Sequence, residues 1–168
     1  MVAEMETTKS DLISAECKAE IDKWVAKYPL DQKQSAVMAA LRIMQDDNGG
    51  YLTTELMDAV ADYLDMTPMA VYEVATFYSM YELSPVGRHK ICVCTNISCM
   101  LSGSDEVVAH LRKRLGIGLG ETTEDGRITL KEVECLGACV DAPMCQIGRQ
   151  YHLKLTPEKI DEILDQLD

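Results

Sequence analysis

The sequence predicts an α+β protein in two parts, a helical bundle over residues 1–86 and a small mixed α/β domain over residues 87–168. Three observations lead to this prediction. Apolar residues recur at helical spacing through the first half, whereas in the second half strand-like alternation flanks a helical segment. Between the halves, Ser84-Pro85-Val86-Gly87 interrupts the helical pattern and marks a domain boundary.

Four helices are predicted in the first half, each from one apolar stripe. Asp31 is the expected N-cap of the second helix, Asn48-Gly49-Gly50 ends it, and Thr67-Pro68 begins the fourth. The Met and aromatic residues on these stripes predict a bundle core rather than a binding groove. In chain order the stripes are Cys17, Ile21, Trp24, Val25 and Tyr28; Val37, Ala40, Leu41 and Met44; Leu56, Met57, Val60, Tyr63 and Leu64; and Val71, Val74, Ala75 and Tyr78.

The second half begins with a predicted strand, a cysteine-bearing loop and a helix. Ile91 and Val93 alternate with cysteines as in a strand, and Ser102-Gly103-Ser104 leads into the helix. Further strands are expected at residues 127–133, 144–147 and 151–155. Because Thr156-Pro157 then starts a last helix, the pattern suggests a small α/β domain of thioredoxin-like type.

Composition and charge argue against two kinds of partner. The formal charge of −12 comes from 28 acidic and 16 basic residues, without a run of Lys or Arg that would neutralise a nucleic-acid backbone. The first residues lack the basic and apolar segments of a signal peptide, and no stretch of about 18 apolar residues occurs. We therefore expect a cytoplasmic protein that neither binds nucleic acid nor inserts into a membrane.

Seven cysteines in such a protein indicate metal or redox chemistry, because cytoplasmic thiols stay reduced and an odd number fits full disulfide pairing poorly. Four of them form two local pairs, Cys94 with Cys99 and Cys135 with Cys139, each in or beside a loop after a strand. In a [2Fe–2S] cluster held by four cysteines, each iron takes two cysteine sulfurs. The spacing therefore predicts that these four cysteines bind one [2Fe–2S] cluster and that the chain carries electrons.

Structural zinc is the main alternative, and it would make the chain an interaction module stabilised by the metal. Zinc also binds four thiolates, but the four-residue gap between Cys94 and Cys99 fits the usual zinc knuckle less well. A dithiol exchange site needs C-x-x-C, and a plant-type ferredoxin needs C-x₄-C-x₂-C. Neither spacing occurs in this sequence.

The other three cysteines are interpreted as structural. We expect Cys92 to be buried and to face away from Cys94, Cys145 to be a buried thiol, and Cys17 to pack as a small apolar residue on its helix. The three histidines are scattered and show no spacing typical of a catalytic site. The sequence therefore shows no substrate chemistry of its own.

The cysteine blocks and several other segments resemble the 24-kDa [2Fe–2S] subunit family of respiratory complex I over nearly the whole length of the sequence. The segments that carry the resemblance are Val74-Ala-Thr-Phe77-Tyr, Val93-Cys-Thr-Asn-Ile-Ser-Cys99-Met, Gly120-Glu-Thr-Thr and Glu134-Cys-Leu-Gly-Ala-Cys139-Val-Asp-Ala-Pro-Met144.

This resemblance implies a helical N-terminal domain, a thioredoxin-like domain, and a cluster on Cys94, Cys99, Cys135 and Cys139. It also implies an electron-transfer role in NADH:quinone oxidoreductase, peripheral to the inner membrane. The expected partners are a flavoprotein that holds FMN and binds NADH, and further iron–sulfur subunits. An equivalent diaphorase subunit of an NAD-linked hydrogenase or formate dehydrogenase is the alternative.

Overall fold

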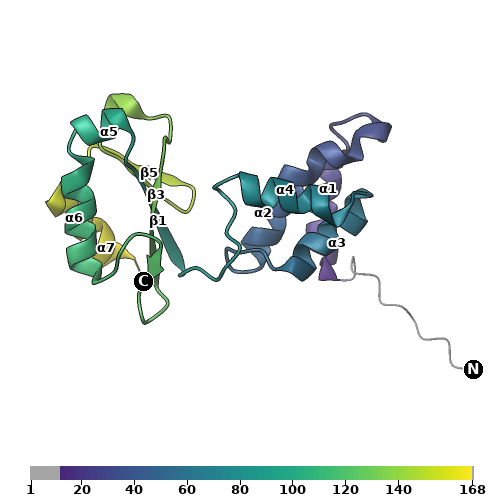
Figure 1. Ribbon diagram of the computed structural model, residues 1–168, viewed down its shortest axis with the longest axis horizontal. Coiled ribbons are helices and arrows are strands. Elements are labelled where there is room, and N and C mark those ends of the chain that lie inside the picture. Colours follow the sequence, from purple (N-terminus) through teal and green to yellow (C-terminus); the bar gives the residue numbers. More distant parts are fainter. Residues whose placement is uncertain (1–11, 168) are drawn as a thin grey trace, which may run out of the picture. The chain divides into compact units, whose positions relative to one another are not determined.

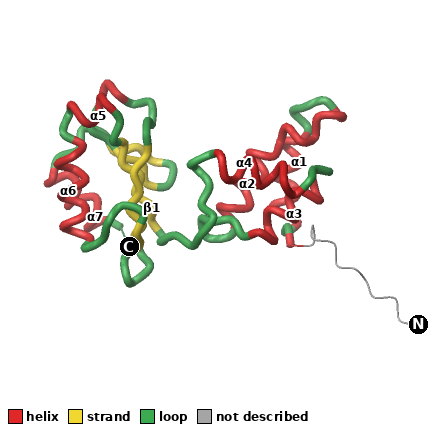
Figure 2. Tube along the Cα trace, in the orientation of Figure 1, coloured by secondary structure: helices red, strands yellow, loops and turns green. Residues whose placement is uncertain are grey.

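The structure, a computed structural model, describes residues 12–167 and divides the chain into two compact units (Figure 1). The first unit ends at Pro85 and the second begins at Val86. Helices make up the first unit, whereas the second combines helices with strands (Figure 2). Within the described residues, no helix is long and apolar enough to cross a membrane.

The first unit contains four α-helices and a short 3₁₀ helix in its described part. They are α1 (Ala15–Val25), the 3₁₀ helix η2 (Leu30–Ala36), α2 (Val37–Asp47), α3 (Thr54–Leu64) and α4 (Pro68–Phe77). Thr67 caps α4 as expected, with its side chain accepting a hydrogen bond from the Ala70 N–H. The expected cap at Asp31 is wrong. Asp31 lies inside η2, its carboxylate accepts a hydrogen bond from the Gln32 side chain, and α2 begins only at Val37.

These helices share one apolar core. Its largest fully buried side chains are Ile21, Leu41, Met44, Leu52, Leu64, Val60 and Val71. Two aromatic residues that were expected to point inward do not, since Tyr28 and Tyr78 are 38% and 37% exposed. The reason is local, because α1 ends at Val25 and Tyr78 is the extended C-cap of α4, so neither side chain continues its helical stripe.

The second unit is built on a five-stranded sheet in the order β2-β3-β1-β4-β5. The strands are β1 (His89–Cys94), β2 (Glu121–Thr122), β3 (Ile128–Val133), β4 (Cys145–Ile147) and β5 (Gln150–His152). β1 and β3 are parallel, and the other pairs are antiparallel. The last strand, β5, is shorter than the strand expected at residues 151–155, and the two-residue β2 was not expected.

Two helices cover one face of this sheet, α6 (Ser104–Leu115) and α7 (Pro157–Gln166), as Figure 1 shows. The core between helices and strands is formed by Val107, Leu111, Ile160 and Leu164 with Ile91, Val93, Ile128, Leu130, Cys145 and Ile147. The Arg114 guanidinium also joins the two helices through Asp161 at 2.9 Å and Asp165 at 3.1 Å. A short helix, α5 (Ile97–Leu101), lies in the loop after β1, where the sequence indicated only a loop.

We predict that Gly87→Ala destabilises the second unit, because a Cβ at this position would lie 2.9 Å from two backbone atoms of Ile128. The Gly87 N–H donates to Thr129 Oγ1 at 2.6 Å, so the backbone cannot easily move away. The expected loss in unfolding free energy is about 1–3 kcal/mol, the usual cost of overpacking. Chemical denaturation measures it. Gly118→Ala is the control, because its new Cβ would meet only the flexible Glu121 carboxylate; equal stability of the two variants would contradict the prediction.

Candidate iron–sulfur site

The two cysteine pairs meet because the strands that precede them are parallel neighbours. Cys94 is the last residue of β1 and lies opposite Val133, the last residue of β3. The loops after both strands consequently leave the same edge of the sheet. The second loop then carries Cys135 and Cys139, so residues about 40 positions apart arrive at one place.

The first pair is buried. Cys94 and Cys99 are 2% and 1% exposed, and they pack with Met144 in a small apolar cluster. Asn96 makes this possible, because its side-chain oxygen accepts the Ile97 N–H at 2.7 Å and caps α5, which turns Cys99 back toward Cys94. The Cys94 N–H donates to the Met144 carbonyl at 3.2 Å and fixes the base of the loop.

The second pair is exposed and lies on a loop that several hydrogen bonds hold in place. Gly137 has a φ of +76°, a conformation that glycine adopts without steric cost, and its N–H donates to Cys135 Sγ at 3.4 Å. The Tyr151 hydroxyl donates to the Leu136 carbonyl at 2.9 Å. After Cys139, the Asp141 carbonyl accepts the Lys154 N–H at 2.8 Å. These bonds hold the cysteine sulfurs at the surface.

The first loop is also joined to the second. The Asn96 side-chain amide donates to the Glu134 carboxylate at 3.3 Å, and Cys94 Sγ lies 3.3 Å from the Glu134 carbonyl. Small and apolar side chains surround the cysteines, with Leu136, Ala138, Ala142 and Leu153 packed against the buried pair. The loops therefore have a common wall that keeps competing polar side chains away from the buried sulfurs.

The Cys99 thiol of the first pair ionises less readily than a free thiol. Burial raises the pKa of the Cys99 thiol to about 11, and its contact with the Cys94 thiol and the proximity of Cys139 also act to raise it. Thiolates in such a site need positive charge close by, which iron supplies. The four residues thus have the right chemistry for a cluster with cysteine ligands.

The structure places the four candidate cysteines as two local pairs on neighbouring loops. The structure brings Cys94 and Cys99 into contact and places Cys139 within electrostatic range of Cys99. A [2Fe–2S] cluster requires only two cysteines at each iron, because bridging sulfides complete each tetrahedron.

The cysteines outside the four candidates have different surroundings. Cys17 and Cys145 are buried in the cores of their units, and burial raises the pKa of the Cys145 thiol to about 12. The expectation for Cys92 is wrong. It is only partly buried, and because it lies two residues before Cys94 on β1, the two side chains leave the same face of the strand.

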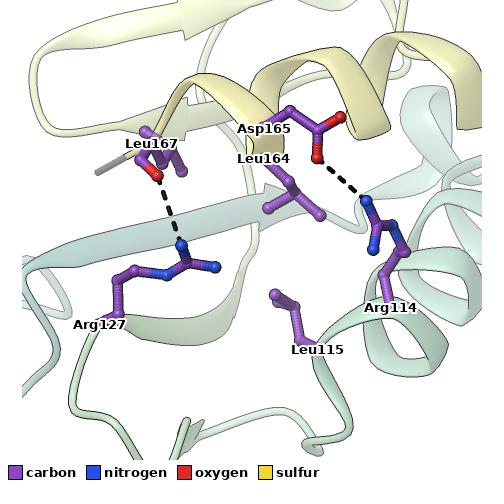
Figure 3. Close-up of a pocket in the computed structure, with 6 residues that line it drawn as sticks. All are labelled: Arg114, Leu115, Arg127, Leu164, Asp165 and Leu167. Atoms are coloured by element: carbon purple, nitrogen blue, oxygen red, sulfur yellow. Dashed lines mark hydrogen bonds and ion pairs between the residues drawn. The ribbon is translucent and has the colours of Figure 1, made fainter.

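A pocket with a volume of about 330 Å³ lies elsewhere in this unit (Figure 3). It is lined by Arg114, Leu115, Arg127, Leu164, Asp165 and Leu167. Its two guanidinium groups already bind protein atoms, Arg114 the Asp165 carboxylate and Arg127 the Leu167 carbonyl. Because none of the lining residues is a cysteine, this pocket is separate from the candidate site.

A family model of the thioredoxin-like [2Fe–2S] ferredoxins matches residues 21–168. This chain belongs to that family. The family membership confirms the predicted thioredoxin-like domain and the predicted [2Fe–2S] cofactor. The assignment of the cluster to Cys94, Cys99, Cys135 and Cys139 stays a prediction, which the geometry of the two loops supports.

Relatives of this ferredoxin-family chain include an NADH-quinone oxidoreductase subunit from Rickettsia felis, which is 48% identical over 142 residues, 84% of this chain and 85% of the relative. The mitochondrial NADH dehydrogenase [ubiquinone] flavoprotein 2 of Dictyostelium discoideum is 44% identical over 88% of this chain and 60% of its own length. These identities confirm the resemblance to the 24-kDa subunit family of complex I.

A solved structure with the same fold is an NAD⁺-reducing [NiFe]-hydrogenase in the H₂-reduced state, with a TM-score of 0.69 and 21% identity. The match covers 78% of this chain and 22% of the hydrogenase chain. At that identity the similarity concerns the fold alone.

Several residues that shape the site were not found by sequence reasoning. Asn96, Tyr151 and Met144 bind or pack against the loops without being ligands. The role of Asn96 could have been predicted, because Asn is a favoured N-cap residue and apolar Ile97 follows it. The role of Tyr151 could not, since its contact with Leu136 depends on the β4–β5 hairpin.

We predict that Cys94→Ser and Cys139→Ser each remove most of the bound cluster, because serine is a poorer ligand for iron than a thiolate. Visible absorption and iron content of anaerobically purified protein measure the loss. Cys92→Ser is the matched control, since Cys92 shares a strand and a face with Cys94. Loss of the cluster in Cys92→Ser, with retention in Cys139→Ser, would show that the ligand set is wrong.

Proposed function

We propose that this chain is the [2Fe–2S] electron-transfer subunit of an NADH-quinone oxidoreductase and accepts one electron from FMN in an NADH-binding partner subunit. The observation that carries the proposal is the meeting of two cysteine pairs at one edge of a parallel strand pair, in a chain 48% identical to an NADH-quinone oxidoreductase subunit. The chain contributes to the enzyme as an electron carrier, without substrate turnover of its own.

In this proposal the four cysteines bind the cluster as an inner and an outer pair. Cys94 and Cys99, both buried, would hold one iron away from water, whereas the exposed Cys135 and Cys139 would hold the other near the surface. A cluster bound there supplies the ability to take up and return one electron. The Gly137 N–H, directed at Cys135 Sγ, stabilises negative charge on the outer side.

The partners follow from the relatives and from the chemistry of NADH. Oxidation of NADH releases a hydride, which is two electrons, and a flavin can accept both and pass them on singly. We therefore propose that FMN and NADH bind in a partner flavoprotein and that further iron–sulfur subunits complete the complex. In this view the chain is attached to the inner membrane only through the complex.

Two other functions are less well supported. A diaphorase subunit of a hydrogenase shares the fold, but the hydrogenase structure is only 21% identical to this chain, against 48% for the relative from Rickettsia felis. A zinc-stabilised interaction module is disfavoured by the family, which carries [2Fe–2S] clusters.

We predict that dithionite reduces the purified chain with about one electron per chain. NADH alone should leave the isolated chain oxidised, and adding catalytic amounts of an FMN-loaded NADH-binding partner subunit should allow NADH to reduce it. An anaerobic optical titration follows both steps. Reduction by NADH without the partner, or no acceleration by it, would contradict the proposed place of this chain in the electron path.

A further inference from the structure

Tyr151 connects the sheet of the second unit to the loop that carries the exposed cysteines. It lies in β5 opposite Gln146 of β4, and β4 in turn pairs with β1, the strand that ends at Cys94. From this position the Tyr151 hydroxyl donates to the Leu136 carbonyl at 2.9 Å. The tyrosine therefore links the strands beside the inner cysteines to the first residue after Cys135.

The acceptor of this hydrogen bond belongs to the same peptide unit as the N–H beside the Cys135 sulfur. A trans peptide unit is planar, and its C=O and N–H groups point in opposite directions. At one end the Leu136 carbonyl accepts the Tyr151 hydroxyl. At the other end the Gly137 N–H donates to Cys135 Sγ at 3.4 Å. Because the unit is rigid, the first hydrogen bond fixes the direction of the second.

The backbone alone does not fix the direction of this peptide unit. Gly137 has a φ of +76°, and glycine adopts positive and negative φ about equally readily. Types I and II β-turns differ by rotation of their central peptide unit, and glycine is compatible with both. Such a rotation would turn the N–H away from Cys135 Sγ and bring the carbonyl oxygen toward it. A support from outside the loop is therefore needed to keep the observed direction.

The closure of the loop does not depend on Tyr151. Its side chain is 45% exposed and lies outside the apolar core described for this unit. The end of the loop is held by separate bonds, in which the Asp141 carbonyl accepts the Lys154 N–H at 2.8 Å and the Pro143 carbonyl accepts the Leu155 N–H at 2.9 Å. Loss of the Tyr151 hydroxyl should therefore change only the part of the loop between the two cysteines.

We propose that Tyr151 is a positioning residue for the cluster, because its hydroxyl keeps the Gly137 N–H directed at Cys135 Sγ. The bond to the Leu136 carbonyl also polarises the peptide unit and strengthens the N–H as a donor. An N–H donated to a ligand sulfur stabilises the more negative, reduced form of a cluster, so Tyr151 raises the reduction potential. The proposal rests on the proposed function in taking Cys135 as a cluster ligand.

The test is the midpoint potential of the full chain, purified anaerobically and followed by EPR during a redox titration. Tyr151→Phe keeps the ring and removes the hydroxyl, and it should retain about two irons because all four thiolates remain. At a fixed potential the ratio of oxidised to reduced cluster should rise about threefold, or about 30 mV in midpoint potential, as expected for weakening one hydrogen bond.

Gln146→Leu is the matched control for the hairpin. The Gln146 side chain lies opposite Tyr151, and its amide donates to the Gly148 carbonyl at 2.8 Å. The substitution therefore removes a bond from a side chain to a carbonyl of the same hairpin, but not one to the peptide unit beside Cys135. Its midpoint potential should equal that of the wild-type chain.

A second substitution tests whether Tyr151 acts through the Gly137 N–H. Gly137→Ala disfavours the observed φ without a clash, since a Cβ there would meet no neighbouring group within 4 Å. It should lower the potential by itself. Adding Tyr151→Phe should then lower the potential little further, because both changes act on the same N–H and such effects are not additive.

Several outcomes would overturn the proposal while the proposed function stands. They are a wild-type potential in Tyr151→Phe, an equal shift in Gln146→Leu, and full addition of the two shifts in the double variant. Loss of the cluster in Tyr151→Phe would assign the hydroxyl to folding of the loop and not to the potential. A wild-type chain without iron and labile sulfide contradicts the proposed function itself, so the two failures are distinguishable.

Discussion

The parallel pairing of β1 with β3 is the constraint on which the candidate site depends. It places Cys94 and Val133 side by side at one edge of the sheet, and the loops that follow leave in the same direction. Helices α6 and α7 stabilise that pairing from one face by packing on Ile91, Val93 and Leu130. The antiparallel β4 adds a second support, because the carbonyl of Met144, just before it, accepts the Cys94 N–H and its side chain packs against both buried cysteines.

The two cysteine pairs differ in their surroundings, so the site has a buried inner side and an exposed outer side. The inner pair lies in an apolar cluster where burial disfavours the Cys99 thiolate, whereas the outer pair lies on a surface loop beside Val140, which is almost fully exposed. Exposure brings the outer sulfurs close to any partner that docks on this edge, and electron transfer requires such proximity. Burial against the apolar inner wall disfavours the more negative, reduced form of a cluster. The Gly137 N–H, which donates to Cys135 Sγ, stabilises that form.

Much of this could be predicted from the sequence, where local patterns decide the structure. The stripes of the first unit, the cap at Thr67 and the strand before Cys94 follow from periodicity and capping. The errors fall where helix ends and the burial of single side chains decide: Asp31 lies in a 3₁₀ helix, Tyr78 lies past the end of α4, and Cys92 is less buried than expected. The cysteine spacing indicated the cluster, but the contacts of Asn96 and Tyr151 depend on segments distant in the chain.

The site is proposed to hold a binuclear cluster through four thiolates on two loops at one sheet edge. Metal and acid-labile sulfide analysis of the anaerobically purified chain tests this most directly. We expect about two irons and two sulfides per chain in a red-brown protein. A colourless protein with about one zinc per chain and no labile sulfide would contradict the proposed cluster.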